Sequence, residues 1–277
     1  MPGLIGASTF ACSDVLGKIV FKDGGDVLTL VTFRGVVGMF FLAAWLRLGP
    51  PLVPFRPRER WIALGLGILF GMTVFGLYQA IDLMDVPTAI LAYFVYPLFT
   101  GMLAAATGLE HLGWRGAAAA AAAFLGLALM VGAHPGELAL VGVLFSIGAA
   151  ISRSALLLIT RATMTQADPR LTTWYSMLSS TGLFVVAALV TRNWQSPAGA
   201  VGWAAMIGTS VTTTIAILAV FISTARVGPF RTALVMNLEP LLAALISAVA
   251  LGDAIAPLQA LGGAIMLAAL VAFQLRR

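Results

Sequence analysis

The sequence predicts an all-α integral membrane protein in which ten transmembrane helices form two five-helix inverted repeats around a central cavity. Three observations predict this class. Hydrophobic residues make up 60% of the 277 positions and charged residues only 10%, whereas soluble domains carry about 25% charged residues. Apolar segments of membrane-spanning length recur along the chain. Two of these segments carry a proline near their centre, 143 positions apart.

The first apolar segment is expected to be a retained membrane span. It lacks a basic region at its start and carries Asp14 and Lys18, both of which are unlike a cleaved signal peptide. A span needs about 20 apolar residues to cross the hydrocarbon core. Ten segments approach or reach this length, at residues 4–20, 28–48, 61–81, 87–107, 116–133, 139–159, 171–191, 201–221, 231–251 and 257–275. Because alternating strand patterns are absent, these spans are predicted to be helices, and their short connections make consecutive helices antiparallel neighbours.

The charges between the spans predict the orientation. With the N-terminus in the cytoplasm, the inner side receives Arg47, Arg56, Arg58, Arg60, Arg115, Arg161, Arg170, Arg226, Arg231, Arg276 and Arg277. The outer side receives Lys22 and Arg192 with the acidic residues Asp23, Asp26, Asp82, Asp85, Glu137 and Asp253. This asymmetry follows the positive-inside rule. We therefore expect a multi-pass protein of a bacterial inner membrane with both termini in the cytoplasm, and the basic balance indicates topology and not nucleic-acid binding.

The two prolines belong to a repeat that covers the whole chain. A shift of 143 residues places Pro97 on Pro240 and aligns "TAILAYFVYPLFTGMLAAATGLE" with "TALVMNLEPLLAALISAVALGD", so that Glu110 meets Asp253. A shift of 141 similarly aligns "LTLVTFR" with "DPRLTTWYS". We predict a first half at residues 1–134 and a second at 139–277. Because five spans is an odd number, the second half is inverted, and inverted repeats with interrupted helices are typical of transporters with a site near the midplane.

Several short motifs carry a family resemblance along essentially the whole chain. They are Phe33-Arg34, Tyr78-Gln79-Ala80, Tyr96-Pro97 with Gly108-Leu109-Glu110, and Glu239-Pro240 with Gly252-Asp253. Together with the ten spans and the repeat, they make the chain resemble an EamA-type member of the drug/metabolite transporter superfamily, and within it the YddG-type amino-acid exporters. The resemblance implies a basket-shaped ten-helix fold, alternating access and export of small metabolites. It does not imply a particular substrate.

The prolines are interpreted as hinges that line the cavity. Pro97 has no N–H, so the carbonyl of Tyr93 loses its helical partner, and Pro240 does the same to Met236. A freed carbonyl in lipid costs several kcal/mol unless a polar group meets it. The alternative is a tolerated kink satisfied by a neighbouring helix.

Five ionisable residues lie deep within the predicted spans: Asp14, Lys18, Arg34, Arg153 and Glu239. At 1.5 Å per residue, Lys18 and Arg34 lie about 10 Å from the outer surface, and Arg153 and Glu239 lie about 10 Å from the inner surface. We expect an outer and an inner gate, and a salt bridge between Arg153 and Glu239. The alternative is that Lys18 and Arg34 snorkel outward and that the others are structural pairs.

The predicted substrate site combines polar groups with soft apolar surface. Its residues are Tyr78, Gln79, Tyr93, Phe94, Met236 and Asn237. The freed carbonyls can accept from an ammonium group, and the aromatic and thioether side chains suit variable apolar groups. We expect a zwitterionic amino acid with an aromatic or aliphatic side chain. A lipophilic cationic drug is the alternative, because aromatic rings also attract cations.

Other function classes find little support in the sequence. The chain carries no G-x-S-x-G, no H-E-x-x-H and no pair of catalytic aspartates, so an intramembrane enzyme is not expected. His111 and His134 are far apart, and Cys12 is the one cysteine, so we expect no metal, cofactor or disulfide. A channel would favour symmetric subunits, whereas this repeat lies within one chain, which we expect to be a monomer. Proton coupling remains open, since Asp14 and Glu239 could each carry a proton.

Overall fold

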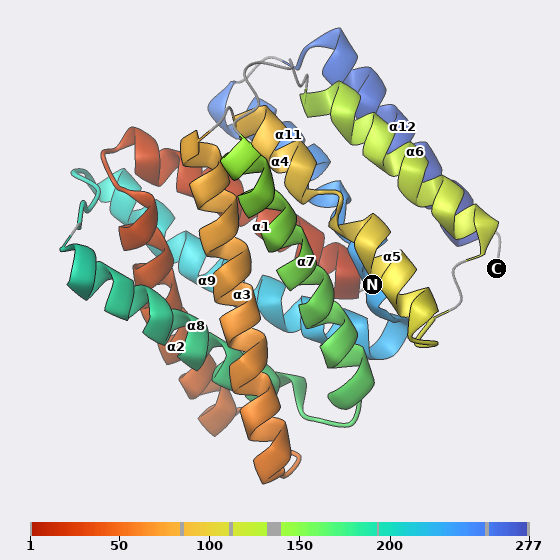
Figure 1. Cartoon of the computed structure of the whole chain (residues 1–277). Helices are drawn as coiled ribbons and strands as arrows, with labels where there is room; N and C mark the ends of the chain where they lie inside the picture. Colours follow the sequence, from red (N-terminus) through yellow and green to blue (C-terminus); the bar gives the residue numbers. More distant parts are fainter. Residues whose placement is uncertain are drawn as a thin grey trace.

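The computed structural model describes residues 2–83, 86–110, 113–131, 140–192, 194–252 and 255–275, and within these ranges every regular element is a helix (Figure 1). The helices are α1 (Pro2–Lys22), α2 (Val27–Leu48), α3 (Pro57–Leu83), α4 (Val86–Tyr93), α5 (Tyr96–Ala106), α6 (Trp114–Val131), α7 (Leu140–Thr163), α8 (Pro169–Thr191), α9 (Ala200–Val227), α10 (Pro229–Met236), α11 (Leu238–Leu251) and α12 (Pro257–Leu275). The expectations that concern Asp85, His111, His134, Glu137, Asp253, Arg276, Arg277 and the boundary at 134–139 fall outside the described residues.

The twelve helices make ten spans. Eight stretches are long and apolar enough to cross a membrane, and two shorter apolar helices lie at Trp114–Leu129 and Pro257–Ala272. The fourth span consists of α4 and α5, and the ninth of α10 and α11, so both proline-containing spans are interrupted. The prediction of an all-helical membrane protein with ten spans in two repeats is confirmed. The helix ends differ by a few residues, most at α9, which is 28 residues long.

Helices of the two halves interleave across the molecule. Helix α1 packs along α9, α3 packs along α7 and α8, and α2 packs against α8 and α9. The last helices of the halves, α6 and α12, pack mainly against each other and lie side by side at one edge of the bundle (Figure 1). The centre is therefore built by both halves together, and the first broken span packs against both α7 and α10 of the second half.

Small residues allow the closest of these crossings. A Cβ atom on Gly67 of α3 would lie 2.0 Å from the carbonyl oxygen of Ser176 on α8, and one on Gly126 of α6 would lie 2.6 Å from that of Gly262 on α12. The Ser176 hydroxyl donates to the carbonyl of Ala63 at 2.9 Å. Close backbone approach with hydroxyl-to-carbonyl bonds is the usual way in which helices associate in a membrane.

Two equivalent aspartates join the halves at opposite ends of the bundle. Asp26 caps α2 and accepts the backbone N–H of Gln195, from the connection between α8 and α9, at 2.8 Å. Asp168 caps α8 and accepts the backbone N–H of Val53, from the connection between α2 and α3, at 3.3 Å. Both the aspartates and their donors are 142 positions apart. The inverted repeat therefore extends to individual hydrogen bonds, which we name after the predicted orientation as the outer bridge (Asp26) and the inner bridge (Asp168).

The inner bridge is reinforced by an arginine that the outer one lacks. Arg170 forms an ion pair with Asp168 at 2.8 Å and donates to the carbonyls of Pro50 and Pro51 at 2.8 and 3.0 Å. Burial alone would raise the pKa of Asp168, but hydrogen bonds from Arg170 and from the Val53 N–H outweigh it and hold the pKa below 3.8. This carboxylate is therefore ionised at neutral pH.

Candidate functional site

The first broken span is lined by aromatic side chains. Helix α4 ends at Tyr93 and α5 begins at Tyr96, with Pro97 in its first turn. The rings of Tyr93, Phe94 and Tyr96 lie within 5.2–5.8 Å of one another, centroid to centroid, and all three residues are buried. Among the described residues, no loop, side chain or neighbouring element donates to the Tyr93 carbonyl. The proline thus leaves a free acceptor beside an aromatic surface.

The next carbonyl in this break is fixed to α7. The carbonyl oxygen of Tyr96 accepts from the hydroxyls of Thr100 and Ser154 at 2.8 and 3.0 Å. The phenol of Tyr96 donates a longer bond of 3.4 Å to the carbonyl of Ala233 on α10. The first break is therefore held to α7 firmly and reaches the ninth span.

The second broken span is more polar. Asn237 alone separates α10 from α11, and Pro240 follows in the first turn of α11. Asn237 is buried, and its Oδ1 has no hydrogen-bond partner in the described part of the chain. Met236 is fully buried, with its sulfur next to Gly6 of α1. The carbonyl of Met236 accepts from no group outside its helix within the same residues, so this break also presents a free acceptor.

Matching positions of the two breaks carry different chemistry. The 143-residue shift places Tyr96 on Glu239, Phe94 on Asn237 and Tyr93 on Met236. Tyr96 is 2% exposed, whereas Glu239 is half-buried. The first break therefore presents rings, and the second presents an amide and a carboxyl group.

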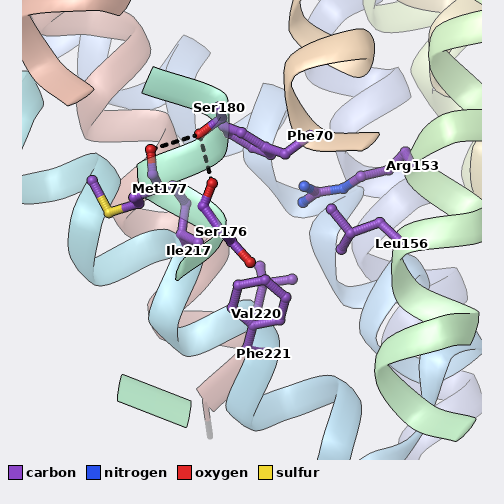
Figure 2. A pocket seen from close by; sticks show the side chains of 9 residues that line it. All are labelled: Phe70, Arg153, Leu156, Ser176, Met177, Ser180, Ile217, Val220 and Phe221. Carbon is purple, nitrogen blue, oxygen red and sulfur yellow. Dashed lines mark hydrogen bonds between the residues drawn. The ribbon is translucent and has the colours of Figure 1, made fainter. Parts of the chain in front are cut away.

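Arg153 of α7 lies beside the first break and within electrostatic reach of Glu239 in the second. Its guanidinium is 5.8 Å from the ring centroid of Phe10 and 6.0 Å from that of Tyr96. The residue is 4% exposed, and its Nε has no hydrogen-bond partner among the described residues. Figure 2 shows the guanidinium directed into a pocket between α3, α8 and α9, with Phe70 and Ser176 on its walls. That pocket has a volume of about 10 Å³, space for about one water molecule.

The predicted salt bridge between Arg153 and Glu239 is not a direct contact in this structure. No N···O distance between them falls within 4.0 Å, although the two groups are near enough to interact electrostatically. Glu239 also interacts with Asp14, and Asp14 with Arg34. Four of the five deep charged residues thus form one chain of neighbours, in which the two acidic residues lie between the two arginines.

The predicted outer-gate residues are distributed over two sides of α1. Asp14 and Lys18 line a pocket of about 310 Å³ between α1, α11 and α12, in which Lys18 contacts Ser247 at 3.5 Å. Arg34 instead lines a pocket of about 20 Å³ with Thr181 and other residues of α8 and α9. The structure therefore does not place Lys18 and Arg34 against each other.

The remaining predicted residues lie on α3, near its C-terminal end. Tyr78 and Gln79 are half-buried. The phenol of Tyr78 is close enough to Arg34 and Asp14 for electrostatic interaction. Tyr78 thus lies near Arg34 and Asp14, whereas Tyr93 lies near Arg153 and Glu239.

Sequence reasoning missed the residues that face Arg153 from α8 and α9. They are Ser176, Met177, Ser180, Ile217, Val220 and Phe221, with Phe70 and Leu156 completing the pocket (Figure 2). A signal was present in the run "TTWYSMLSSTG" of α8, in which hydroxyl residues recur at helical spacing. Ser180 donates to the Ser176 carbonyl at 2.9 Å, so part of this signal reflects hydroxyls bonded within their own helix.

Comparison with known proteins identifies the architecture. The model of the "EamA-like transporter family" matches residues 2–132 and again residues 140–273. Among solved structures, 29 chains match. One, described as "Crystal structure of protein", is 22% identical, covers 100% of this chain and 99% of its own, and has a TM-score of 0.81. At this identity the likeness shows the fold alone. A comparison with curated protein sequences gives no match.

Proposed function

The chain belongs to the EamA-like transporter family, and on that premise we propose that it exports small zwitterionic metabolites, foremost neutral and aromatic amino acids, by alternating access. The family is one of membrane transporters and not of enzymes. We also propose that its substrates and its direction of transport are similar to those of the YddG-type amino-acid exporters.

The observation that carries the proposal is the combination of both charge signs at the broken spans. Arg153 lies beside the first break, while Glu239 and Asn237 belong to the second, and Asn237 Oδ1 has no hydrogen-bond partner in the described residues. A net cation or anion would meet a like charge here. An α-amino acid carries one charge of each sign on neighbouring atoms, which matches this arrangement.

The apolar part of the site supports a variable side chain. Tyr93, Phe94 and Tyr96 form a cluster of rings, and Met236 adds a flexible thioether from the other half. Aromatic and thioether groups accept side chains of different shapes without specific hydrogen bonds. This favours a range of aromatic and aliphatic amino acids over a single one.

A cationic drug is the second candidate, and one contact argues against it. The ring of Tyr96 that could attract a cation already has the Arg153 guanidinium near it, at 6.0 Å from its centroid. A positive ligand at that ring would be repelled by the arginine. Export of cations would therefore need a site farther from α7.

The test is a competition panel with purified protein in proteoliposomes that take up labelled phenylalanine. We expect saturable uptake with counterflow, inhibition by unlabelled phenylalanine and threonine, and little inhibition by lipophilic cations. Tyr93→Ala should weaken uptake several-fold, whereas Tyr175→Ala should not, because Tyr175 stacks on Phe55 outside the two breaks at 5.5 Å. Inhibition by cationic drugs but by no neutral amino acid would overturn the proposal.

The orientation of the chain can be tested separately from its substrate. We propose Pro97 and Pro240 as hinges and a cytoplasmic location for both termini in a bacterial inner membrane. A tag on either end should be cleaved by added protease in inverted vesicles and protected in right-side-out ones. Cleavage in right-side-out vesicles would reverse the proposed topology.

A further inference from the structure

The most buried arginine of the described residues has an unusual environment. Arg153 is 4% exposed, and no carboxylate of the described residues lies within 4.0 Å of it. A buried guanidinium ordinarily has a direct carboxylate partner, because removing the charge from water costs several kcal/mol. Here its guanidinium lies 5.8 Å from the ring centroid of Phe10 and 6.0 Å from that of Tyr96, and the Tyr96 phenol is close enough for a hydrogen bond.

A second polar group is similarly unsatisfied on the opposite side. Asn237 is 4% exposed, and its Oδ1 accepts no hydrogen bond in the described residues. Two positions later, Glu239 places a carboxylate in electrostatic reach of Arg153 but outside direct contact. Buried polar atoms without partners are rare in native proteins and require an explanation. A ligand that donates to the second break and accepts at Arg153 would satisfy both groups.

We propose that Arg153 binds the substrate's carboxylate and that Glu239 with Asn237 binds its ammonium group, so that one α-amino acid connects α7 with the second broken span. This rests on the proposed function, which it deepens by assigning each charge of the substrate to a residue. The planar guanidinium suits a carboxylate because it offers parallel N–H donors. One carbon separates the two charged groups of an α-amino acid, which fits a short gap between an arginine and a glutamate.

The arrangement also suggests why substrate binding is linked to helix movement. The pocket into which Arg153 points holds only about 10 Å³ (Figure 2), so a carboxylate enters it only when α8 and α9 move away from α7. The free carbonyls at Tyr93 and Met236 lie at the same breaks. A substrate bound at Arg153 therefore requires α7 to separate from α8 and α9, all three of which belong to the second half.

Three ligands separate the two charge contacts. Phenylalanine has both groups, phenylalaninamide retains the ammonium but lacks the carboxylate, and 3-phenylpropionate retains the carboxylate but lacks the ammonium. Their competition against labelled phenylalanine is measured in proteoliposomes with the full chain. We expect the wild-type protein to prefer phenylalanine over both analogues by about tenfold or more.

Each variant should then lose the preference for phenylalanine over one of the two analogues. Arg153→Met should weaken phenylalanine by about tenfold or more and leave phenylalaninamide nearly unchanged, and Glu239→Gln should remove the preference over 3-phenylpropionate. Arg161→Met is the matched control: it removes another arginine of α7, whose guanidinium donates to the Ala225 carbonyl, and should preserve both preferences. Arg153→Lys keeps the charge and allows the test to proceed if Arg153→Met does not fold, with a smaller loss expected in the same direction.

The outcomes distinguish this inference from the proposed function. If wild-type protein binds no amino acid, the proposed function is wrong. If wild-type protein binds phenylalanine, but Arg153→Met and Arg153→Lys weaken phenylalanine and its amide equally, then Arg153 is structural and only the assignment is overturned.

Discussion

The two broken spans occupy matching positions in the repeat but differ in composition and in attachment. The first break has the rings of Tyr93, Phe94 and Tyr96, and its Tyr96 carbonyl is bonded to Thr100 and Ser154. The second has Asn237 and Glu239 at the equivalent places, and Asn237 Oδ1 has no partner among the described residues. Each half thus contributes one part of a site that neither contains alone.

The two bridges show the opposite behaviour. Asp26 with the Gln195 N–H and Asp168 with the Val53 N–H keep the same chemistry at positions related by 142 residues. These bonds connect the halves near the ends of α2 and α8, away from the breaks. The repeat is therefore retained where it supports the scaffold and has diverged where a small asymmetric ligand would bind.

The largest expected effect comes from removing the prolines, which tests whether the breaks differ as hinges. Pro240→Ala restores an N–H that can bond the free Met236 carbonyl, so α10 and α11 should join into one helix. Pro97→Ala restores an N–H that can bond the Tyr93 carbonyl, but Thr100 and Ser154 still hold the Tyr96 carbonyl. We expect Pro240→Ala to slow transport about tenfold and Pro97→Ala about threefold.

The measurement is the initial uptake rate in proteoliposomes that contain equal amounts of folded protein. Pro257→Ala, at the start of α12 and outside both breaks, serves as the control and should leave the rate unchanged. Equal losses at Pro97 and Pro240, or a larger loss at Pro97, would contradict the difference in attachment.

The breaks themselves could be predicted from the sequence, because a proline removes a donor wherever the helix lies. The ten spans follow for a similar reason: their length and apolar composition are fixed by the bilayer. The predicted partner of Arg153 could not be obtained in this way. Its neighbours depend on how α7 is rotated against α1 and α5, and this rotation places Phe10 and Tyr96 beside it instead of a direct contact with Glu239.

Two other features were beyond sequence reasoning for different reasons. The bridges use the backbone N–H groups of Val53 and Gln195, and every residue but proline has such a donor, so no residue type marks them. The separation of Lys18 from Arg34 depends on which face of α1 meets α11 and α12. Depth along a helix can be counted from the sequence, whereas direction around it requires the packed structure.

The second expected effect is on stability and compares the two bridges. Asp26→Ala removes a helix cap and its bond to Gln195, which should lower the free energy of unfolding by about 1 kcal/mol. Asp168→Ala should cost about 1 kcal/mol more, because Arg170 also loses its ion-pair partner. Melting temperatures in detergent measure both variants. Glu59→Ala removes the exposed hydrogen bond that the Arg56 N–H donates to the Glu59 carboxylate and should change stability least. A smaller effect at Asp168 than at Asp26 would show that Arg170 does not reinforce the inner bridge.

The smallest expected effect concerns how stability depends on pH. This dependence should differ between Asp168 of the inner bridge and Glu110, which follows the first broken span. The pKa of Asp168 is held below 3.8, so its stabilisation is complete above that pH and is lost as the pH falls through the lower folded value. Glu110 accepts the Phe230 N–H at 2.7 Å, yet burial outweighs that bond and raises its pKa above 4.5. The folded state therefore binds this proton more tightly, and stability falls as the pH rises from 4.5 through the raised value.

A series of melting temperatures between about pH 3 and pH 8 resolves the two carboxylates. Relative to wild type, Glu110→Gln should remove the decline above pH 4.5, because its amide oxygen still accepts from Phe230 without carrying a charge. Asp168→Asn should reduce the loss below pH 3.8 and leave the higher range unaltered. If Asp168→Asn changed the profile above pH 4.5 instead, the inner carboxylate would be titrating near neutrality. The inner bridge would then respond to pH near neutrality and would not be a constant part of the scaffold.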